Sequence, residues 1–445
     1  MNLHDILKIS NGEIINGDVK DININKIEID SRKVEDNDLF ICIKGRNNDG
    51  YNYINEIKDK CSCIVVSSDV KIDTNTLIIK VEDTIIFMNE LASKIRKKYS
   101  NIPLISITGS YGKTTTKELL SHVLSSKYNV LYTKGNFNNN IGIPTTLFNL
   151  NNNYNLIVLE MGMNHLNEIS FLSKMYVPNL CIITNIGTSH IGYLKSKKNI
   201  LKAKMEITDG LDNGILVLNS KDKYLKKIKR NKNNTIYNIE DFKVFNVLST
   251  QKHLYFSFIY NKKVYNVRFN IPNTSLISNI LLVIKTCLIY EIDINTIIEK
   301  LESFQTLEGR SNVLEIKNNS ILVDDCYNAS YESIISSLNM IKNFKDDKIV
   351  ILGDILELGI YSKKIHLKLG KFLKKYKNKY NTLVITVGTN MKLINKFIDS
   401  INFNTSEEVN KYISNINLEN KCILLKGSRG MHLEKIKEYL INEKS

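Results

Sequence analysis

The sequence predicts an α/β protein of three domains, and three observations lead to this fold class. Its 445 residues are too many for one ordinary domain. Short apolar runs of buried-strand type alternate with stretches of helical period along most of the chain. One such run leads into a glycine-containing turn that opens a helix, an arrangement that can hold nucleotide phosphates. We expect a small α/β domain over residues 1–98, a central P-loop-type domain over 99–309 and a third domain over 310–445.

The first domain is predicted from apolar runs that alternate with polar turns. A helix over residues 84–99 closes the domain, because its apolar side chains recur on one face. The expected strands of this domain are residues 27–29, 39–43, 63–66 and 77–81.

The other two domains are predicted from longer series of buried-type strands. Such strands suit a mainly parallel sheet covered by helices, whereas residues 242–271 alternate like an antiparallel hairpin. Strands of the central sheet are expected at 102–107, 156–159, 180–184 and 215–218. The third domain is expected to be Rossmann-like, with strands at 321–323, 348–352, 383–387 and 422–425.

Composition limits the classes of function. The net charge of +15 comes from lysine, 54 against 7 arginines, and the lysine runs lack interleaved aromatic residues. We interpret them as solvated faces rather than a nucleic-acid site, although their field would attract small polyanions. No apolar run is long enough to span a membrane, and the N-terminal residues lack a signal-peptide profile. Seven scattered cysteines are expected to be free thiols, so we expect a cytoplasmic protein.

The most informative motif is Thr-Gly-Ser-Tyr-Gly-Lys-Thr-Thr-Thr-Lys at residues 108–117. Gly109 and Gly112 allow successive N–H groups to point at a phosphate, Lys113 adds a full positive charge, and Thr114 offers a hydroxyl to Mg²⁺. Only two residues, Ser110 and Tyr111, separate the glycines, whereas the usual P-loop has four. The motif predicts nucleotide binding.

Two polar side chains follow predicted central strands, and a third lies on a helix-like segment after them. Glu160 ends one strand, where a carboxylate can hold Mg²⁺ or its water; the alternative is a solvated strand-end glutamate. His190 opens a loop at the same sheet edge and is a candidate metal ligand, although a lone histidine is more often structural. By spacing alone, Lys204 is an ordinary surface lysine, no better a candidate than Lys202.

Further candidates lie in loops. The asparagine-rich segment 135–144 suits a sugar or peptide substrate, and a plain loop is nearly as good an interpretation. In the third domain, residues 324–329 and 426–430 each follow a strand and face the crevice where such folds bind ligands. Arg310, beside Gly309 at the inferred hinge, is placed to reach a phosphate.

Taken in order, these motifs resemble the Mur ligases. The resemblance runs through nearly the whole chain and includes Asp30-Ser31-Arg32 in the first domain. Within the family it is closest to the branch that adds a dipeptide, because of the asparagine loop, Leu352-Gly-Asp-Ile-Leu-Glu-Leu-Gly359 and Lys426-Gly-Ser-Arg-Gly-Met431. The first-domain signature is shared with the sister ligase that adds the third amino acid, whose Asp-Asn-Pro-Arg motif is absent.

The resemblance implies a role for each matching residue. Lys113, Glu160, His190 and Lys204 would be catalytic. Thr114, Glu160, His190 and Lys204 would hold Mg²⁺ at two sites, with Lys204 carbamylated by CO₂; that modification is implied only by the resemblance. ATP would bind Gly109, Ser110, Tyr111, Gly112, Lys113, Thr114, Thr115, Asn279, Arg310, Asp325 and Asn328. Substrates would bind Ser31, Arg32, Asn138, Asn139, Lys426, Ser428 and Arg429.

The chain also departs from the family pattern at four places. Ser275-Leu276 replaces His-Asn, and Ser330-Tyr331 replaces Asn-Pro. Asn167 replaces a glycine, and Gly192 replaces an acidic residue two positions after the histidine. These departures concern the edge of the nucleotide site and its loops, whereas the core ATP and Mg²⁺ residues are present.

The resemblance implies an ATP-dependent amide ligase. It would add D-alanyl-D-alanine to UDP-N-acetylmuramoyl-tripeptide through an acyl phosphate, in peptidoglycan precursor synthesis. The alternatives are the third-residue ligase, a folylpolyglutamate-type ligase, or a nucleotide-dependent regulator that has lost catalysis. We expect a monomer, and the sequence leaves open whether the tripeptide ends in diaminopimelate or lysine.

Overall fold

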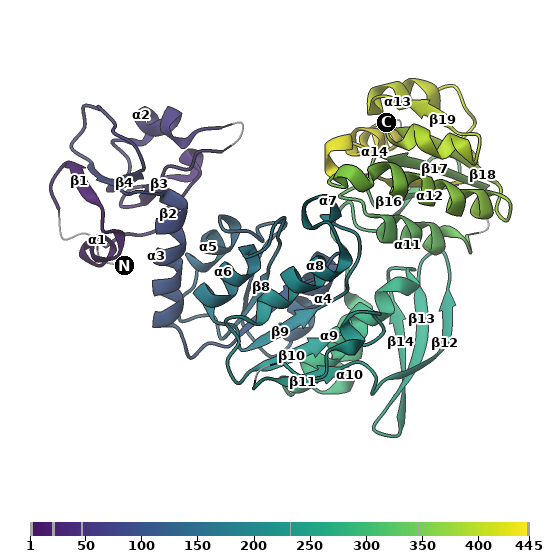
Figure 1. The fold of residues 1–445 in the computed structure, drawn as a ribbon, viewed down its shortest axis with the longest axis horizontal. Helices are drawn as coiled ribbons and strands as arrows, with labels where there is room; N and C mark the ends of the chain where they lie inside the picture. The colour runs from purple at the N-terminus through teal and green to yellow at the C-terminus, as the bar shows by residue number, and fades with distance from the viewer. Residues whose placement is uncertain (1–2, 20–22, 46–47, 232, 345–346, 443–445) are drawn as a thin grey trace.

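The computed structural model describes residues 3–19, 23–45, 48–231, 233–344 and 347–442. It is an α/β protein whose main sheets follow one another along the chain, as the sequence predicts (Figure 1). In the described ranges, no helix combines the length and apolarity that crossing a membrane requires. The seven cysteines, all within these ranges, are buried free thiols, as expected.

The N-terminal sheet has the order β1-β5-β4-β3-β2 and is parallel except for β1, which pairs antiparallel with β5. Its helix α3 (Thr84–Lys98) agrees with the sequence prediction and begins where the Asp83 carboxylate accepts bonds from two N–H groups of the first turn. The other elements are α1 (Leu3–Ser10), β1 (Glu13–Asn16), β2 (Ile27–Glu28), β3 (Leu39–Ile41), α2 (Ile54–Ile57), β4 (Cys63–Val66) and β5 (Leu77–Lys80).

The central sheet is entirely parallel, in the order β11-β10-β9-β6-β8-β7, with helices on both faces. Its strands are β6 (Leu104–Thr108), β7 (Val130–Tyr132), β8 (Leu156–Glu160), β9 (Leu180–Ile183), β10 (Ile215–Leu218) and β11 (Thr235–Asn238). Its helices are α4 (Lys113–Leu124), α5 (Gly142–Leu147), α6 (Glu168–Tyr176), α7 (Ile191–Leu194), α8 (Lys197–Met205), α9 (Ile277–Ile289) and α10 (Ile294–Ser303).

The predicted hairpin is part of a three-stranded antiparallel sheet, β12-β13-β14. Strands β13 (Leu254–Tyr260) and β14 (Lys263–Phe269) form the hairpin, and β12 (Lys243–Ser249) adds an outer strand. The turn lies at Asn261 and Lys262, which both have positive φ (49° and 63°), as a tight two-residue turn requires.

The C-terminal sheet has the order β15-β16-β20-β17-β18-β19 and is parallel except at β15. Its strands are β15 (Asn312–Ile316), β16 (Ser320–Asp324), β17 (Asp347–Gly353), β18 (Thr382–Val387), β19 (Ile401–Phe403) and β20 (Lys421–Lys426). Its helices are α11 (Tyr331–Ile341), α12 (Ser362–Lys377), α13 (Ser406–Ile413) and α14 (Glu434–Asn442).

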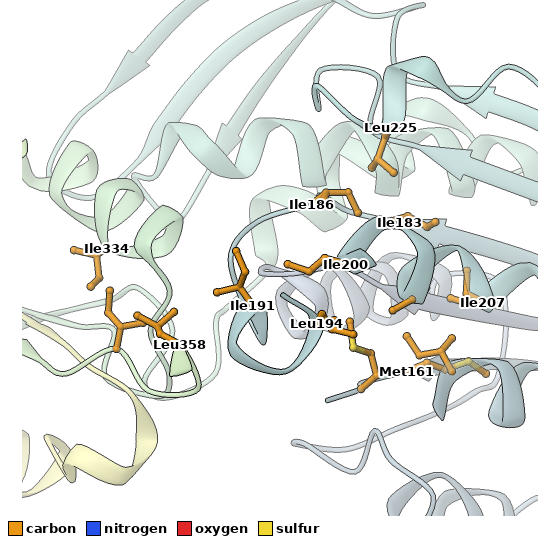
Figure 2. Close-up of a cluster of buried hydrophobic side chains, with 14 of the residues drawn as sticks. Met161, Ile183, Ile186, Ile191, Leu194, Ile200, Ile207, Leu225, Ile334 and Leu358 are labelled. Carbon is orange, nitrogen blue, oxygen red and sulfur yellow. The ribbon is translucent and has the colours of Figure 1, made fainter. Parts of the chain in front are cut away.

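One buried apolar cluster continues from the central domain into the C-terminal domain (Figure 2). Ile191 and Leu194 of the short helix α7 belong to it, together with Ile334 of α11 and Leu358. The two domains are therefore docked through a shared core rather than through polar contacts alone, and this docking closes the cavity described next.

Candidate active site

The predicted phosphate loop connects β6 to α4, and its two glycines are required by close contacts. Gly109 has φ +156°, and a Cβ there would lie 1.8 Å from the Thr184 hydroxyl oxygen. Gly112 has φ +74°, and a Cβ there would lie 2.5 Å from the Asn279 amide nitrogen. Helix α4 begins at Lys113, so its unpaired N–H groups face the loop. The short spacing thus still forms a glycine turn at a helix N-terminus, and its predicted binding of phosphate stays a prediction.

Lys113 lies inside this loop, where its Nζ donates to the Gly109 carbonyl at 2.9 Å. Burial lowers the pKa of Lys113, and the nearby Glu160 carboxylate opposes that shift. A lysine in this position can place its charge against a phosphate oxygen once one enters the loop.

Glu160 ends β8, as predicted, and only 1% of its surface is exposed. Its Oε1 accepts a bond from Asn138 Nδ2 at 2.7 Å, so the asparagine-rich loop holds this carboxylate. Its Oε2 is buried and has no hydrogen-bond partner among the described residues. An unpartnered buried carboxylate oxygen is a donor atom suited to a hard divalent cation.

Lys204 differs most from what its sequence position suggests. It is fully buried on α8, and its Nζ has no hydrogen-bond partner within the described ranges. Burial lowers its pKa well below the ordinary value, and the neighbouring Lys113 lowers it further. Burial thus favours the uncharged form of the amine, which is the form that reacts with CO₂, and this direction agrees with the modification that the resemblance implies.

His190 precedes α7 and lines the same cavity as Lys113 and Glu160. Its Nδ1 lies 2.7 Å from Oε2 of Glu357, a residue of the C-terminal domain. Burial lowers the pKa of His190, and the Glu357 carboxylate opposes this shift. The sequence offered Glu357 only as part of the Leu352–Gly359 motif, which could not reveal a contact with a distant histidine.

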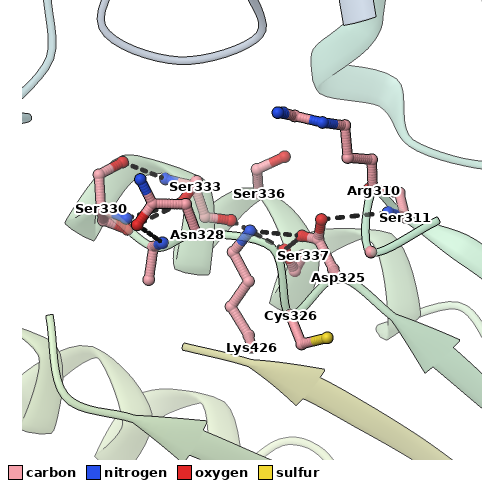
Figure 3. A network of polar contacts seen from close by, with 12 residues as sticks. Arg310, Ser311, Asp325, Cys326, Asn328, Ser330, Ser333, Ser336, Ser337 and Lys426 are labelled. Atoms are coloured by element: carbon pink, nitrogen blue, oxygen red, sulfur yellow. Dashed lines mark hydrogen bonds and ion pairs between the residues drawn. The ribbon is translucent and has the colours of Figure 1, made fainter. Parts of the chain in front are cut away.

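The C-terminal domain supplies a second polar wall (Figure 3). The Asp325 carboxylate lies 2.7 Å from Lys426 Nζ and accepts a bond from the Ser311 N–H at 3.0 Å. The Arg310 guanidinium stands over the Tyr327 ring at 4.1 Å from its centroid. An arginine stacked on a ring is held in one orientation, which suits contact with a phosphate or a flat base.

Asn279 comes from the central domain and lies beside the phosphate loop. Its Nδ2 donates to the Gly112 carbonyl at 3.2 Å and to the Thr116 hydroxyl at 2.7 Å. In this structure it therefore braces the phosphate loop, while the predicted contact with adenine stays a prediction.

A cavity of about 430 Å³ lies between the central and C-terminal domains, and most of these groups line it, whereas Lys204 and Gly109 do not. No group of three unmodified His, Cys, Asp or Glu side chains able to hold a metal occurs among the described residues. The predicted residues that line the cavity are Ser110, Tyr111, Gly112, Lys113, Thr114, Thr115, Asn138, Asn139, Glu160, His190, Asn279, Arg310, Asp325, Asn328 and Lys426.

Four predicted substrate residues do not line this cavity. Ser31 and Arg32 lie in the N-terminal domain, where Arg32 is exposed and pairs with Asp30 at 2.8 Å. Ser428 accepts a bond from the Leu356 N–H at 2.9 Å, and Arg429 is 63% exposed. Their predicted roles concern other parts of the substrates and stay predictions.

Comparison with known proteins finds relatives in sequence. Residues 107–287 match the model of the Mur ligase middle domain, and residues 23–107 match that of the Mur ligase family, catalytic domain. The UDP-N-acetylmuramoyl-tripeptide–D-alanyl-D-alanine ligase of Rickettsia prowazekii is 32% identical over 94% of this chain and 95% of its own length. The ligase of the same name from Buchnera aphidicola subsp. Acyrthosiphon pisum is 30% identical over 100% of this chain and 98% of its own.

Solved structures agree in fold over the full length. MurF from Acinetobacter baumannii superposes with a TM-score of 0.91 at 26% identity and covers 99% of this chain and 98% of its own. MurF from Thermotoga maritima in complex with ADP gives a TM-score of 0.83 at 25% identity, covering 95% of this chain and 99% of its own.

Proposed function

Because this chain belongs to the Mur ligase family, we propose that it joins D-alanyl-D-alanine to UDP-N-acetylmuramoyl-tripeptide at the expense of ATP. It is an enzyme of peptidoglycan precursor synthesis. The observation that carries this function is the convergence of Lys113, Glu160 and His190 on one cavity, which Arg310 and Asp325 of the C-terminal domain close.

The reaction has two steps. The terminal carboxylate of the tripeptide attacks the γ-phosphorus of ATP, the bond from that phosphorus to ADP breaks, and an acyl phosphate and ADP are formed. The amine of D-alanyl-D-alanine then attacks the acyl carbon, the amide bond forms, and phosphate and a proton leave. Positioning and charge neutralisation account for most of the catalysis in phosphoryl transfer.

The residues of the loop bind and orient ATP. The N–H groups at the start of α4 and the Lys113 ammonium would hold the phosphates and stabilise charge that develops on the transferred group. Arg310, fixed over Tyr327, is placed to meet the nucleotide from the opposite wall. Docking of the C-terminal domain excludes water, which would otherwise hydrolyse the acyl phosphate.

Mg²⁺ fits the donor set that the cavity offers. Thr114 and Glu160 would hold one ion, and His190 with a carbamylated Lys204 a second; the unpartnered Glu160 Oε2 and Lys204 Nζ support this assignment. When bound, Mg²⁺ would offset the charge of the phosphates. Carbamylation would convert Lys204 from a buried amine into a carboxylate, with release of one proton.

We place the reaction in the cytoplasm, where ATP is made and where the buried free thiols of this chain stay reduced. The protein is proposed to act as a monomer, because the residues that line the cavity complete it within a single chain. Its three domains are proposed to divide at about residues 98 and 309, with the sugar nucleotide contacting Ser31 and Arg32 of the first.

The test is ADP release in the presence of ATP, D-alanyl-D-alanine and the UDP-muramoyl tripeptide, run with the diaminopimelate and the lysine forms. ADP release that requires the dipeptide is expected with one form or both, and its absence with both would refute the function. Lys113→Ala should lose ligation while its circular dichroism is unchanged, whereas Lys134→Ala, an exposed lysine outside the cavity, should retain it. Full turnover by Lys113→Ala would show that the phosphate loop is misassigned.

A further inference from the structure

The segment between β17 and α12 of the C-terminal domain lies against the loop that carries His190. The N–H of Gly192 donates to the Glu357 carbonyl at 3.1 Å, and the Tyr361 hydroxyl donates to the Lys195 carbonyl. Leu358 faces Ile191 across the same contact (Figure 2). Two polar contacts and an apolar one therefore hold this segment against α7.

The contact depends on a glycine. A Cβ at position 192 would lie 2.6 Å from the Glu357 carbonyl oxygen and 2.7 Å from the Gly359 nitrogen. Both are backbone atoms, which cannot move aside as a flexible side chain can. Any side chain at position 192 would therefore push the segment away from His190.

The close approach brings the Glu357 carboxylate to His190, with 2.7 Å between Oε2 and Nδ1. Glu357 also lines the cavity, together with Lys113 and Glu160. Glu357 Oε2 and His190 Nδ1 lie at ion-pair distance, although Nδ1 makes no hydrogen bond of good geometry to any described residue. A carboxylate this close to Nδ1 can orient the ring and leaves Nε2 as the remaining nitrogen for a cation. The acidic partner comes from a different domain than the histidine.

We propose that Glu357 is a positioning residue that orients His190 for a divalent cation, and that this orientation exists only while the C-terminal domain is docked. The proposal rests on the proposed function, because that function assigns His190 to a cation. Gly192 takes part by allowing the Glu357 segment to approach. Domain docking and the completion of the cation site are then one event.

The alternative role for Glu357 is to hold the interface together, but other contacts already do so. Glu332 of α11 accepts bonds from the Thr188 N–H at 3.0 Å, from the Thr188 hydroxyl at 2.6 Å, and from Lys197 Nζ at 2.9 Å. The apolar cluster adds to these bonds. Loss of the Glu357 carboxylate should therefore leave the domains docked while it frees His190.

The first test measures binding of Mn²⁺ in the presence of a non-hydrolysable ATP analogue, with no peptide substrate, by electron paramagnetic resonance. Glu357→Gln should weaken the His190-dependent site about 10-fold or more, a typical effect of removing a partner of a metal-binding histidine. His190→Ala identifies that site. Tyr361→Phe removes an interdomain hydrogen bond that does not touch His190 and should change the affinity less than twofold.

Equal Mn²⁺ affinity in Glu357→Gln and Tyr361→Phe would overturn the proposal, as would unchanged binding in His190→Ala. Gly192→Ala, which keeps the carboxylate but forces its segment away, should lower the affinity as Glu357→Gln does. If Gly192→Ala binds Mn²⁺ as the wild type does, the requirement that the Glu357 segment lie close to His190 is refuted.

A second measurement is independent of metal. In ¹⁵N-histidine spectra of the metal-free protein, the His190 signals, assigned with His190→Ala, should show the proton on Nδ1. Glu357→Gln should shift them toward a mixture of tautomers, and unchanged signals would overturn the proposal. Dipeptide-dependent ADP release by the wild type tests the function separately: its absence would refute the ligase assignment but not an effect of Glu357 on His190.

Discussion

Replacing the buried amine of Lys204 should make the protein more stable while it abolishes ligation. Lys204 is fully buried, and its Nζ has no hydrogen-bond partner among the described residues, so folding removes the amine from water without compensation. Leaving such a group unsatisfied costs about 1–3 kcal/mol. Methionine is unbranched, has a helix propensity close to that of lysine, and needs no partner. Lys204→Met should therefore raise the free energy of unfolding by about 1–3 kcal/mol in metal-free, CO₂-free buffer.

Lys202 provides a matched control because it is exposed on the same helix, two residues away. Lys202→Met should change stability by less than about 0.5 kcal/mol, as most surface substitutions do. Urea denaturation, together with hydrogen exchange of peptides from α8, measures the change in the free energy of unfolding for each of the two variants. A Lys204→Met protein less stable than Lys202→Met would refute the reasoning, because it would mean that the amine is partnered. Bicarbonate with Mg²⁺ should stabilise the wild type and leave Lys204→Met unchanged, and the opposite pattern would refute the carbamate.

Two further predictions concern the phosphate loop and the N-terminal domain. Gly109→Ala should cost more than about 2 kcal/mol and most ligation activity, because its Cβ would lie 1.8 Å from the Thr184 hydroxyl. Gly135 also has positive φ (55°), but a Cβ there would meet no described atom within 4 Å. Thermal unfolding of Gly135→Ala should therefore show a loss of stability of only about 1 kcal/mol. An equal loss of stability in the two variants would contradict the steric explanation. The hydrogen bond from Arg32 lowers the pKa of Asp30 to about 2, so this pair stabilises the fold above pH 3.8 and loses its effect as pH falls toward 2. Carboxyl ¹³C titration should show the pKa of Asp30 moving back toward its ordinary value in Arg32→Met, and no movement would exclude the side chain as the cause.

The positions that follow strands could be predicted because they depend on local pattern. Glu160 was expected at the end of a buried strand, and β8 ends there. The helix over 84–99 was also predicted closely, since its apolar face and its acidic cap are both local signals. Parallel strands then bring such ends to one edge of the sheet, whatever their separation in sequence.

Burial and contacts between domains could not be predicted in this way. The spacing of Lys202 and Lys204 does not say which of them is buried, because that depends on what packs against α8. Residue chemistry alone left Lys204 as a surface lysine, and only the family resemblance selected it. The pairing of Glu357 with His190 joins residues far apart in sequence, and it requires a docked arrangement of two domains that no local pattern encodes.

The sequence pattern predicts one antiparallel hairpin over residues 242–271, whereas the structure has three strands in that range, with β12 on the outside. Strand β12 has a register shift between Phe245 and Leu248 and exposes Val247 and Leu248, so its alternation is irregular. Strands β13 and β14 pair in continuous register up to the turn at Asn261 and Lys262.

The apolar cluster that Ile191 and Leu194 share with Ile334 and Leu358 determines how temperature acts on the enzyme. Burial of apolar surface is driven by entropy near 25 °C and is accompanied by a negative change in heat capacity. We therefore expect docking of the C-terminal domain to weaken on cooling. The enzyme should lose activity in the cold more steeply than its chemical step alone would, because fewer molecules have the complete cavity.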